Sequence, residues 1–288
     1  MVQFRVGSVP EHFTLPWHLA QESGAFQKQG VAIDWQDYPN GTGAMMADLR
    51  EGKLDIAVAL TEGVVADIIQ HQSGKIAQLF VTSPLTWGIH VASGSSYQQV
   101  DELEGKTFAI SRMGSGSHLM AFVMAKQLGW ATEDLPLEIV GGMDGARKAL
   151  ASGDADVFMW EKFMTKPVVD SGEFRRVGEF DTPWPCFAVV VRNETLADHS
   201  AEVETLLEVV QKSALDFMEL PDASQLVAQR YHLNIEDAQE WFERTKWATD
   251  FAIETDTLRL VMDSLVECQV INSKLEPSQL CSKLVQLK

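Results

Sequence analysis

The sequence predicts an α/β protein of two similar lobes, each a mixed sheet flanked by helices, and three observations support this prediction. Short apolar, strand-like segments alternate with helix-like segments along most of the chain, which is typical of sheets connected by helical crossovers. One pattern of helix, glycine, acidic turn and strand occurs twice. The 288 residues, of which 45% are apolar, also suffice for two domains at about 150 residues per domain.

The elements of the first lobe follow from apolar spacing and from turn residues. Pro16 suits the first turn of a helix, and Gly52 is expected in the left-handed conformation that ends one. The turn Pro39-Asn40-Gly41 closes the second strand. The expected elements are strands at 4–6, 31–35, 55–60, 76–81 and 88–92, and helices at 15–26, 43–51 and 64–71.

The second lobe shows the same alternation, and a helical tail follows it. The tail begins after Asn193, where amphipathic segments replace the strands, and we expect it to pack on the first lobe. The expected elements of the second lobe are strands at 106–110, 137–140, 155–160, 176–178 and 187–191, and helices at 117–129, 145–151 and 165–171. The tail helices are expected at 201–219, 222–231, 235–248 and 256–269.

An internal repeat links the two lobes. The pattern Leu49-x-x-Gly52-x-x-Asp55-Ile56 recurs as Leu150-x-x-Gly153-x-x-Asp156-Val157, an offset of 101 residues from 49 to 150. The chain is expected to leave the first lobe near Ala92 and to return near Arg192. The predicted domains are therefore residues 1–91 with 192–288, and residues 92–191, with a ligand cleft between two lobes that two hinge segments connect.

The stretch from Thr107 to Gly129 has the composition of a ligand-binding corner. An apolar strand leads through a loop of glycine and serine into a helix, whose first N–H groups and dipole attract an anionic or strongly polar group. The alternative is an ordinary strand-to-helix turn with Ser115 or Ser117 as N-cap. The loop lacks the third glycine of a dinucleotide fingerprint and the Gly-Lys-Ser/Thr of a phosphate-binding loop.

Composition excludes several classes of partner. The net charge of −18, from 41 acidic and 23 basic residues, repels nucleic acids and anionic lipid surfaces. No apolar run approaches the roughly 20 residues of a membrane helix, so no membrane insertion is expected. The N-terminus lacks the features of a signal peptide, which predicts a cytoplasmic location, or a periplasmic one if a signal peptide has been trimmed away.

Four longer stretches resemble the type II periplasmic-binding-protein fold. They are PWHLAQESGAFQKQGVAIDW, NGTGAMMADLREGKLDIAVA, ELEGKTFAISRMGSGSH and ALASGDADVFMWEKF. In particular, they are similar to the branch that contains sulfonate and nitrate solute receptors and the yeast thiamine-pyrimidine synthases. The resemblance covers roughly residues 4 to 195 well and the tail loosely, and it extends to stand-alone members in fungi and marine bacteria that lack an export signal.

The resemblance implies that the ligand contacts lie on loops after the strands of both lobes. On the first lobe these positions are Glu11, His12, Phe13, Gly41, Thr42, Thr61, Glu62 and Ser83. On the second lobe and the crossings they are Trp87, Ser111, Met113, Ser115, Gly116, Ser117, Trp160, Glu161 and Trp184. The implied ligand has two ends: an anion or carbonyl at the Ser115–Ser117 N–H groups, and a nitrogenous ring or amine at carboxylates and indoles. Zwitterions, pyrimidine-like heterocycles and sulfonates all fit.

Each of these positions also has a structural interpretation. Trp160 could be a ring-stacking wall or buried packing at the end of a strand. Glu62 and Glu161 are expected at the same place in the two lobes, the end of the strand after the repeated turn. Either could select a cationic group or act only as a charge partner of a helix N-terminus. His12 and His118 lack a second ligand at metal spacing, so no metal is expected.

Two functions from different classes remain. The first is a non-catalytic solute receptor without a cofactor, which would serve an ABC permease if exported and which closes on its ligand by hinge motion. The second is an enzyme resembling the thiamine-pyrimidine synthases, but those carry a cysteine-rich tract, whereas Cys186, Cys268 and Cys281 are far apart. No nucleophile elbow is present, and Cys186 is expected to be a small apolar residue near the second hinge. The receptor is the favoured hypothesis.

Overall fold

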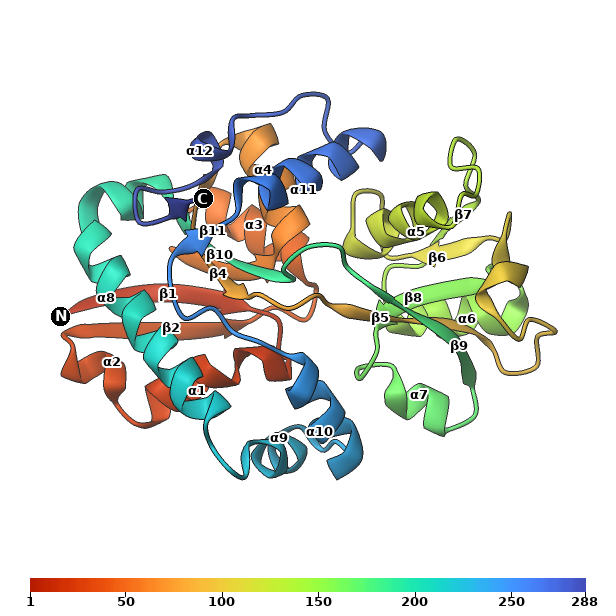
Figure 1. The fold of residues 1–288 in the computed structure, drawn as a ribbon, viewed down its shortest axis with the longest axis horizontal. Helices are drawn as coiled ribbons and strands as arrows, with labels where there is room; N and C mark the ends of the chain where they lie inside the picture. The colour runs from red at the N-terminus through yellow and green to blue at the C-terminus, as the bar shows by residue number, and fades with distance from the viewer. The chain divides into compact units, whose positions relative to one another are not determined.

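The computed structural model describes residues 1–288, and the chain forms two compact units. Unit 1 comprises Met1–Ser83 and Trp184–Lys288, and unit 2 comprises Pro84–Pro183. Each unit contains a five-stranded sheet with helices (Figure 1). The predicted α/β class with two mixed sheets is confirmed. No helix is both long enough and apolar enough to cross a lipid bilayer.

The sheet of unit 1 has the strand order β2-β1-β3-β10-β4. Strand β1 pairs in parallel with β2 and β3, whereas β10 is antiparallel to both β3 and β4. The strands are β1 (Val2–Ser8), β2 (Val31–Asp37), β3 (Ile56–Leu60), β4 (Gly74–Val81) and β10 (Phe187–Arg192), and a small parallel pair is formed by β11 (Ala252–Ile253) and β12 (Gln286–Leu287).

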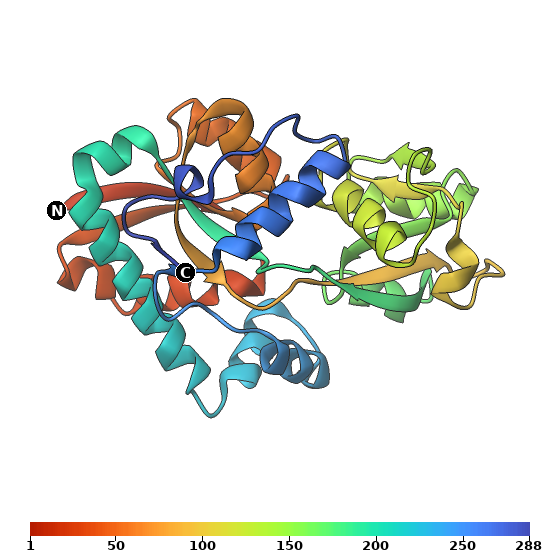
Figure 2. The same ribbon diagram turned by 45° about the horizontal axis from the view of Figure 1, so that its top comes forward.

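The helices of unit 1 cover its sheet in two groups. Helix α8 packs against α1 and α2, and α11 and α12 pack against α4, as Figure 1 and Figure 2 show. The predicted packing of the helical tail on the first unit is therefore confirmed. The helices are η1 (His12–Thr14), α1 (Leu15–Glu22), α2 (Ala25–Lys28), α3 (Thr42–Arg50), α4 (Thr61–His71), α8 (Asn193–Met218), α9 (Ala223–Tyr231), α10 (Ile235–Arg244), α11 (Thr255–Glu267) and α12 (Pro277–Leu280).

The sheet of unit 2 has the strand order β7-β6-β8-β5-β9. Strand β6 pairs in parallel with β7 and β8, whereas β5 is antiparallel to both β8 and β9. The elements are β5 (Thr86–Ala92), η2 (Val100–Leu103), β6 (Phe108–Ile110), α5 (Gly116–Gln127), β7 (Leu137–Ile139), α6 (Met143–Ser152), β8 (Val157–Glu161), α7 (Lys166–Asp170) and β9 (Phe174–Asp181).

The sequence repeat corresponds to the same structural unit in both sheets. Gly52 and Gly153 have φ angles of 70° and 80°, so both end a helix in the left-handed conformation. The carboxylate of Asp55 accepts a hydrogen bond from the backbone N–H of Arg5 at 2.9 Å. The carboxylate of Asp156 accepts one from the N–H of Thr107 at 3.1 Å. The repeated acid therefore ties the start of one strand to its neighbour, at the end of the sheet opposite the strands' carboxyl termini.

We expect Asp156→Ala to destabilise unit 2 by about 1–3 kcal/mol, because it leaves the Thr107 N–H without its acceptor. It also removes the partner of the Tyr97 hydroxyl. Urea unfolding followed by circular dichroism measures the loss. The control is Asp154→Ala, which removes an exposed carboxylate two residues earlier and should have little effect. Equal losses in the two variants would contradict the role of the repeated acid.

The predicted domain boundaries differ from those of the structure. Residues 88–92 were expected in the first lobe and 187–191 in the second, but β5 pairs with β8 and β9 in unit 2, and β10 pairs with β3 and β4 in unit 1. The boundaries lie at Ser83/Pro84 and Pro183/Trp184. Strand β5 thus belongs to unit 2 and not to unit 1, and strand β10 belongs to unit 1 and not to unit 2.

Several helix limits also differ from the prediction. Gly24, with a φ angle of 68°, splits the predicted helix 15–26 into α1 and α2. Helix α4 begins at Thr61, directly at the end of β3, so residues 61–63 are helical and not a loop. Helix α8 begins at Asn193 and is kinked at His199. Helix α10 ends at Arg244, four residues before the predicted end at 248.

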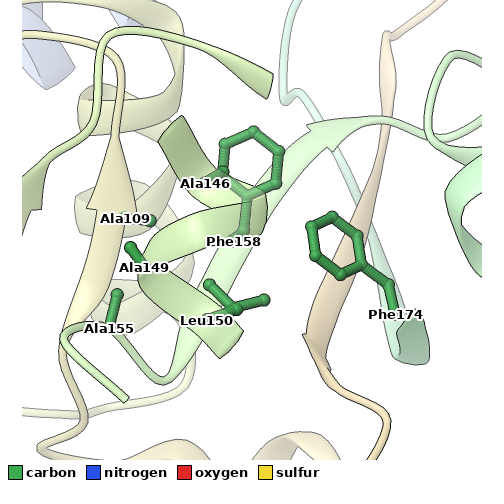
Figure 3. Packing of buried hydrophobic residues seen from close by; sticks show 7 residues of the cluster. All are labelled: Ala109, Ala146, Ala149, Leu150, Ala155, Phe158 and Phe174. Atoms are coloured by element: carbon green, nitrogen blue, oxygen red, sulfur yellow. The ribbon is translucent and has the colours of Figure 1, made fainter. Parts of the chain in front are cut away.

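A compact apolar cluster lies between helix α6 and the sheet of unit 2. Phe158 on β8 is fully buried, and Leu150 on α6 faces the same cluster (Figure 3). Small alanines on α6 let the helix approach the strands closely. The cluster consists of Ala109, Ala146, Ala149, Leu150, Ala155, Phe158 and Phe174.

Candidate functional site

The carboxyl ends of the parallel strands of unit 1 meet at one edge of its sheet. Strand β10 runs antiparallel, so its first residue, Phe187, lies at this edge opposite Leu60 and Val81. We call this the carboxyl edge of unit 1, formed by residues 9–14, 38–42, 60–62, 82–83 and 184–187. Ligands of open α/β sheets bind at such edges.

Hydrogen bonds bring predicted residues from different loops together at this edge. The hydroxyl of Thr42 accepts from the Leu60 N–H at 3.2 Å. The Thr61 hydroxyl donates to the Pro185 carbonyl at 2.6 Å. Ser83 accepts from the Lys246 N–H through its side chain at 3.1 Å. Thr42, Thr61 and Ser83 therefore hold the loops in place, and Gly41, with a φ angle of 73°, precedes the first turn of α3.

Glu62 is a buried carboxylate that accepts hydrogen bonds from neutral donors alone. It is 4% exposed, and its Oε2 accepts a hydrogen bond from the indole N–H of Trp184 at 3.0 Å. Burial raises the pKa of Glu62, and the hydrogen bond from Trp184 lowers it in part. The structure thus joins two predicted site residues that are distant in sequence, and it buries both.

The loop after β1 contributes one desolvated acid and two packed rings. Burial raises the pKa of Glu11 to about 7 and lowers the pKa of His12 to about 3, so His12 is neutral at physiological pH. The ring of His12 lies 4.4 Å from that of Trp241 and stacks on Phe13 at 5.1 Å. His12 and Phe13 are buried in this aromatic cluster, which explains their positions by packing within unit 1.

We expect Glu11 to make unit 1 less stable as the pH rises. A carboxyl whose pKa is raised in the folded state favours folding below its unfolded pKa of about 4.5 and loses that contribution as the pH rises through about 7. At pH 8, Glu11→Gln should therefore melt at a higher temperature than the parent. Near pH 4, the melting temperatures of the two proteins should be equal. Thermal melts from pH 4 to 8 test this, with the exposed Glu204→Gln as control. A pH-independent difference would contradict the assignment.

The sheet of unit 2 has a corresponding carboxyl edge. It is formed by residues 86–87, 111–117, 140–143, 161–164 and 181–182, because β5 runs antiparallel and begins there. The indole N–H of Trp87 donates to the hydroxyl of Thr182 at 2.9 Å. Trp87 is buried, so its polar atom serves to anchor the strand rather than to reach solvent.

The serine-rich loop before α5 is held largely by its own side chains. Ser115 is the N-cap of α5, as one of the two sequence alternatives had it, and its Oγ accepts from the His118 N–H at 3.3 Å. The Oγ of Ser117 accepts from the Ser111 N–H at 3.0 Å. The hydroxyls of Ser115 and Ser117 are therefore engaged, and a ligand would instead meet the first-turn N–H groups of α5, which helix geometry leaves without intrahelical acceptors.

The exposure of this loop varies from residue to residue. Ser115 and Ser117 are buried, Ser111 and Gly116 are half-buried, and the Met113 side chain is 58% exposed. The exposed part of the loop is therefore residues 112–114, directly before the buried N-cap Ser115.

Trp160 and Glu161 at the end of β8 have clear structural roles. The half-buried ring of Trp160 stacks on Phe158, with centroids 5.3 Å apart. Glu161 is buried, and its Oε2 accepts from the N–H groups of Phe163 and Met164 at 2.8 and 2.6 Å. The repeat aligns Glu161 with Leu60 and not with Glu62, so the predicted equivalence of the two acids is wrong.

Sequence reasoning missed Arg112, which lies inside the predicted anion-binding loop. Arg112 is an exposed residue whose partly desolvated guanidinium has a lowered pKa. It makes no hydrogen bond or ion pair, whereas the chain's nine other arginines each have an acceptor. The signal was present in the sequence, because a cation next to Ser111 and three residues before Ser115 adds to the attraction of the helix N-terminus for an anion.

The histidines and cysteines offer no metal centre. No group of three His, Cys, Asp or Glu side chains has the spacing to hold an ion. The Nδ1 of His118 accepts from the Gly114 N–H at 3.1 Å, and burial lowers its pKa. Cys186, Cys268 and Cys281 are buried and form no disulfide, and burial raises the pKa of Cys281 to about 12.

Comparisons with known proteins agree with this architecture. Residues 87–180 match a family described as Ca3427-like periplasmic binding protein. The Candida albicans CA3427 gene product, described as defining a new family with the generic periplasmic binding protein fold, is 25% identical, has a TM-score of 0.88, and covers 99% of this chain and 98% of its own. No curated protein sequence gave a match.

Two sulfonate-binding proteins have similar structures. The alkanesulfonate-binding protein SsuA from Xanthomonas axonopodis pv. citri, bound to MOPS, is 15% identical with a TM-score of 0.78, covering 99% of this chain and 98% of that one. The periplasmic aliphatic sulphonate binding protein SsuA from Escherichia coli is 17% identical with a TM-score of 0.72, covering 99% and 94%. These likenesses concern the fold, since both identities are low.

Proposed function

We propose, from the premise that this chain is a type II periplasmic-binding-protein-like protein, that it binds a small polar or heterocyclic solute and closes on it by hinge motion. The observation that carries the proposal is the same sheet topology in both units, which gives each unit a carboxyl edge of the kind where ligands of open α/β sheets bind. A solute-binding role is in keeping with the sulfonate-binding proteins of similar fold.

The two connecting segments support hinge motion. The boundary between the units falls at Pro84 in one segment and at Pro183 in the other. A proline has no N–H and cannot donate a hydrogen bond to a backbone ladder, so the ladder is weakened at both boundaries. Backbone hydrogen bonds join the segments within each unit: Cys186 N to Ser83 O at 3.1 Å in unit 1, and Thr182 N to Leu85 O at 3.0 Å in unit 2. Rotation would therefore be confined to a few residues.

The loop before α5 supports recognition of an anionic group on the ligand. Arg112 supplies an unpaired cation, and the N–H groups of Gly116 and Ser117 lie in the first turn of α5. The whole chain carries a net charge of −18, which makes an unpaired cation at this edge unusual. A sulfonate or carboxylate fits this combination of fixed dipoles and charge.

A thermal-shift screen tests the proposed function. The panel comprises alkyl and amino sulfonates, MOPS, pyrimidines, polyamines and amino acids. A solute present at a hundred times its dissociation constant should add about 2.7 kcal/mol to the free energy of unfolding. Small-angle scattering should then show a smaller radius of gyration, and mass spectrometry should recover the solute unchanged. Consumption of the solute would favour the enzyme, and a panel without any stabilising compound would contradict solute binding.

The proposed partner is the permease of an ABC importer, in the case that the protein is exported. Support comes only from a protein of similar structure that is described as the ligand binding component of an ABC-type import system from Staphylococcus aureus. Fractionation of cells that produce the tagged protein tests the cytoplasmic alternative. Recovery with the membrane-embedded permease after cross-linking, only in the presence of solute, would support the importer role.

A further inference from the structure

The chain neutralises its buried carboxylates in different ways. Asp67 forms an ion pair with Arg50 and accepts a hydrogen bond from the Ser73 hydroxyl. Glu161 accepts from two backbone N–H groups. Glu62 has neither a cation nor a pair of backbone donors, although it is only 4% exposed. It therefore differs from the other two.

The hydrogen bonding of Glu62 leaves acceptor capacity unused. A carboxylate has two oxygens and about four acceptor positions. Oε2 accepts from the Trp184 indole at 3.0 Å, and the backbone N–H of Glu62 itself also donates to the carboxylate, but no cation does. An ionised group in such a site is costly unless a donor or a cation completes its coordination. Its position at the start of α4, which follows directly from β3, places it at the carboxyl edge of unit 1.

A second carboxylate at the same edge also lacks a neighbouring cation. Glu11 follows β1, is half-buried, and its side chain forms no hydrogen bond or ion pair. The neighbouring imidazole of His12 does not compensate its charge, because burial keeps that ring neutral. Unit 1 therefore presents two desolvated acids at the edge where ligands of this fold class bind, and neither has a cation of the chain beside it.

We propose that the carboxyl edge of unit 1 binds a basic nitrogen of the solute, with Glu62 as the acceptor for a protonated amine and Glu11 as a second negative charge. This inference rests on the proposed function and names its substrate class. Together with the anionic group proposed above, this makes the substrate class a small zwitterion such as an amino sulfonate or an amino acid.

The purely structural alternative is that Glu62 serves only to hold Trp184 next to the unit boundary. Two variants separate the roles. In Glu62→Gln the side-chain oxygen still accepts from the Trp184 indole, but the negative charge is lost. In Trp184→Phe the donor is lost, but the carboxylate remains. Glu51→Gln removes one exposed negative charge on the surface of unit 1 and is the control for net charge.

Calorimetric titration of two isosteric probes tests the proposal. The probes are 2-aminoethanesulfonate and 2-hydroxyethanesulfonate, which differ in the basic nitrogen. We expect the parent to bind the amino compound at least tenfold more tightly. Glu62→Gln should lower the affinity for the amino compound at least tenfold and change the affinity for the hydroxy compound less than threefold. Glu11→Gln should act in the same direction. Trp184→Phe and Glu51→Gln should keep the preference for the amino compound.

The remaining outcomes overturn the proposal. Equal affinity of the parent for both probes, or equal weakening of both in Glu62→Gln, means that Glu62 is structural. Suppose that neither sulfonate binds but that another compound of the screening panel does. If that compound has no basic nitrogen, the inference is overturned, whereas the proposed solute binding stands. If no compound of the panel binds, the proposed function fails and the inference fails with it.

Discussion

Replacing Phe158 by alanine should lower the free energy of unfolding of unit 2 by about 3–5 kcal/mol, the cost of removing a large aromatic side chain from a packed core. Phe158 is fully buried on β8, which lies between β6 and β5. The centroid of its ring lies 6.2 Å from the Phe174 ring centroid. The Trp160 ring stacks on the Phe158 ring, with centroids 5.3 Å apart. The substitution therefore removes support from the apolar cluster and from a predicted ligand-contact residue.

Hydrogen exchange resolved by peptide is the suitable measurement, because two units need not unfold together. Peptides of β6, β8 and α6 should lose protection, whereas peptides of β1 and β3 in unit 1 should keep theirs. Phe158→Leu is the matched control, since it keeps an apolar side chain in the cluster and should cost less than half as much. A loss below 1 kcal/mol, or an equal loss of protection in both units, would show that this cluster does not hold unit 2 together.

Local features of the fold could be predicted because their causes lie close together in the sequence. The left-handed caps at Gly52 and Gly153 follow from a glycine after an apolar helical stretch. The N-cap at Ser115 follows from a serine before one. The repeat also indicated that both units share one topology, and the order of the strands in the two sheets confirms it.

The unit boundaries could not be predicted, because they depend on long-range strand pairing. The apolar strands 88–92 and 187–191 fit the interior of either sheet, and nothing in their composition specifies a partner. The unit to which each strand belongs follows only from the ladders that β5 and β10 form. The prolines at positions 84 and 183 were a usable signal, since each weakens a ladder at the boundary.

The burial of the candidate site residues also depends on contacts between segments that are distant in the sequence. The positions of Thr42, Thr61 and Glu62 at strand ends were predictable from chain order, but the burial of Trp87 and Trp184 was not, because an indole fits both a core and a binding wall. The role of Glu161 in capping a turn depends on the path of residues 162–164 after the strand. Which of the predicted residues contact a solute stays a prediction.

Arg112→Gln should weaken the binding of an anionic solute by tenfold to a hundredfold. A hydrogen bond to a charged group contributes about 1.5–3 kcal/mol, and each 1.4 kcal/mol is a factor of ten in affinity. Because the Arg112 side chain is exposed and has no partner within the protein, its loss should change the melting temperature very little. The effect on binding is thus separable from an effect on folding.

Titration with 2-hydroxyethanesulfonate, which has no basic nitrogen, isolates the anionic end of the solute. Arg112→Lys should retain part of the affinity, because it keeps the charge and loses the planar fork. Arg147→Gln is the matched control: it removes one positive charge from the same unit, at a surface ion pair with Glu173, and should leave binding unchanged. If Arg112→Gln and Arg147→Gln reduce affinity equally, the effect comes from net charge alone and the loop before α5 does not hold the anion.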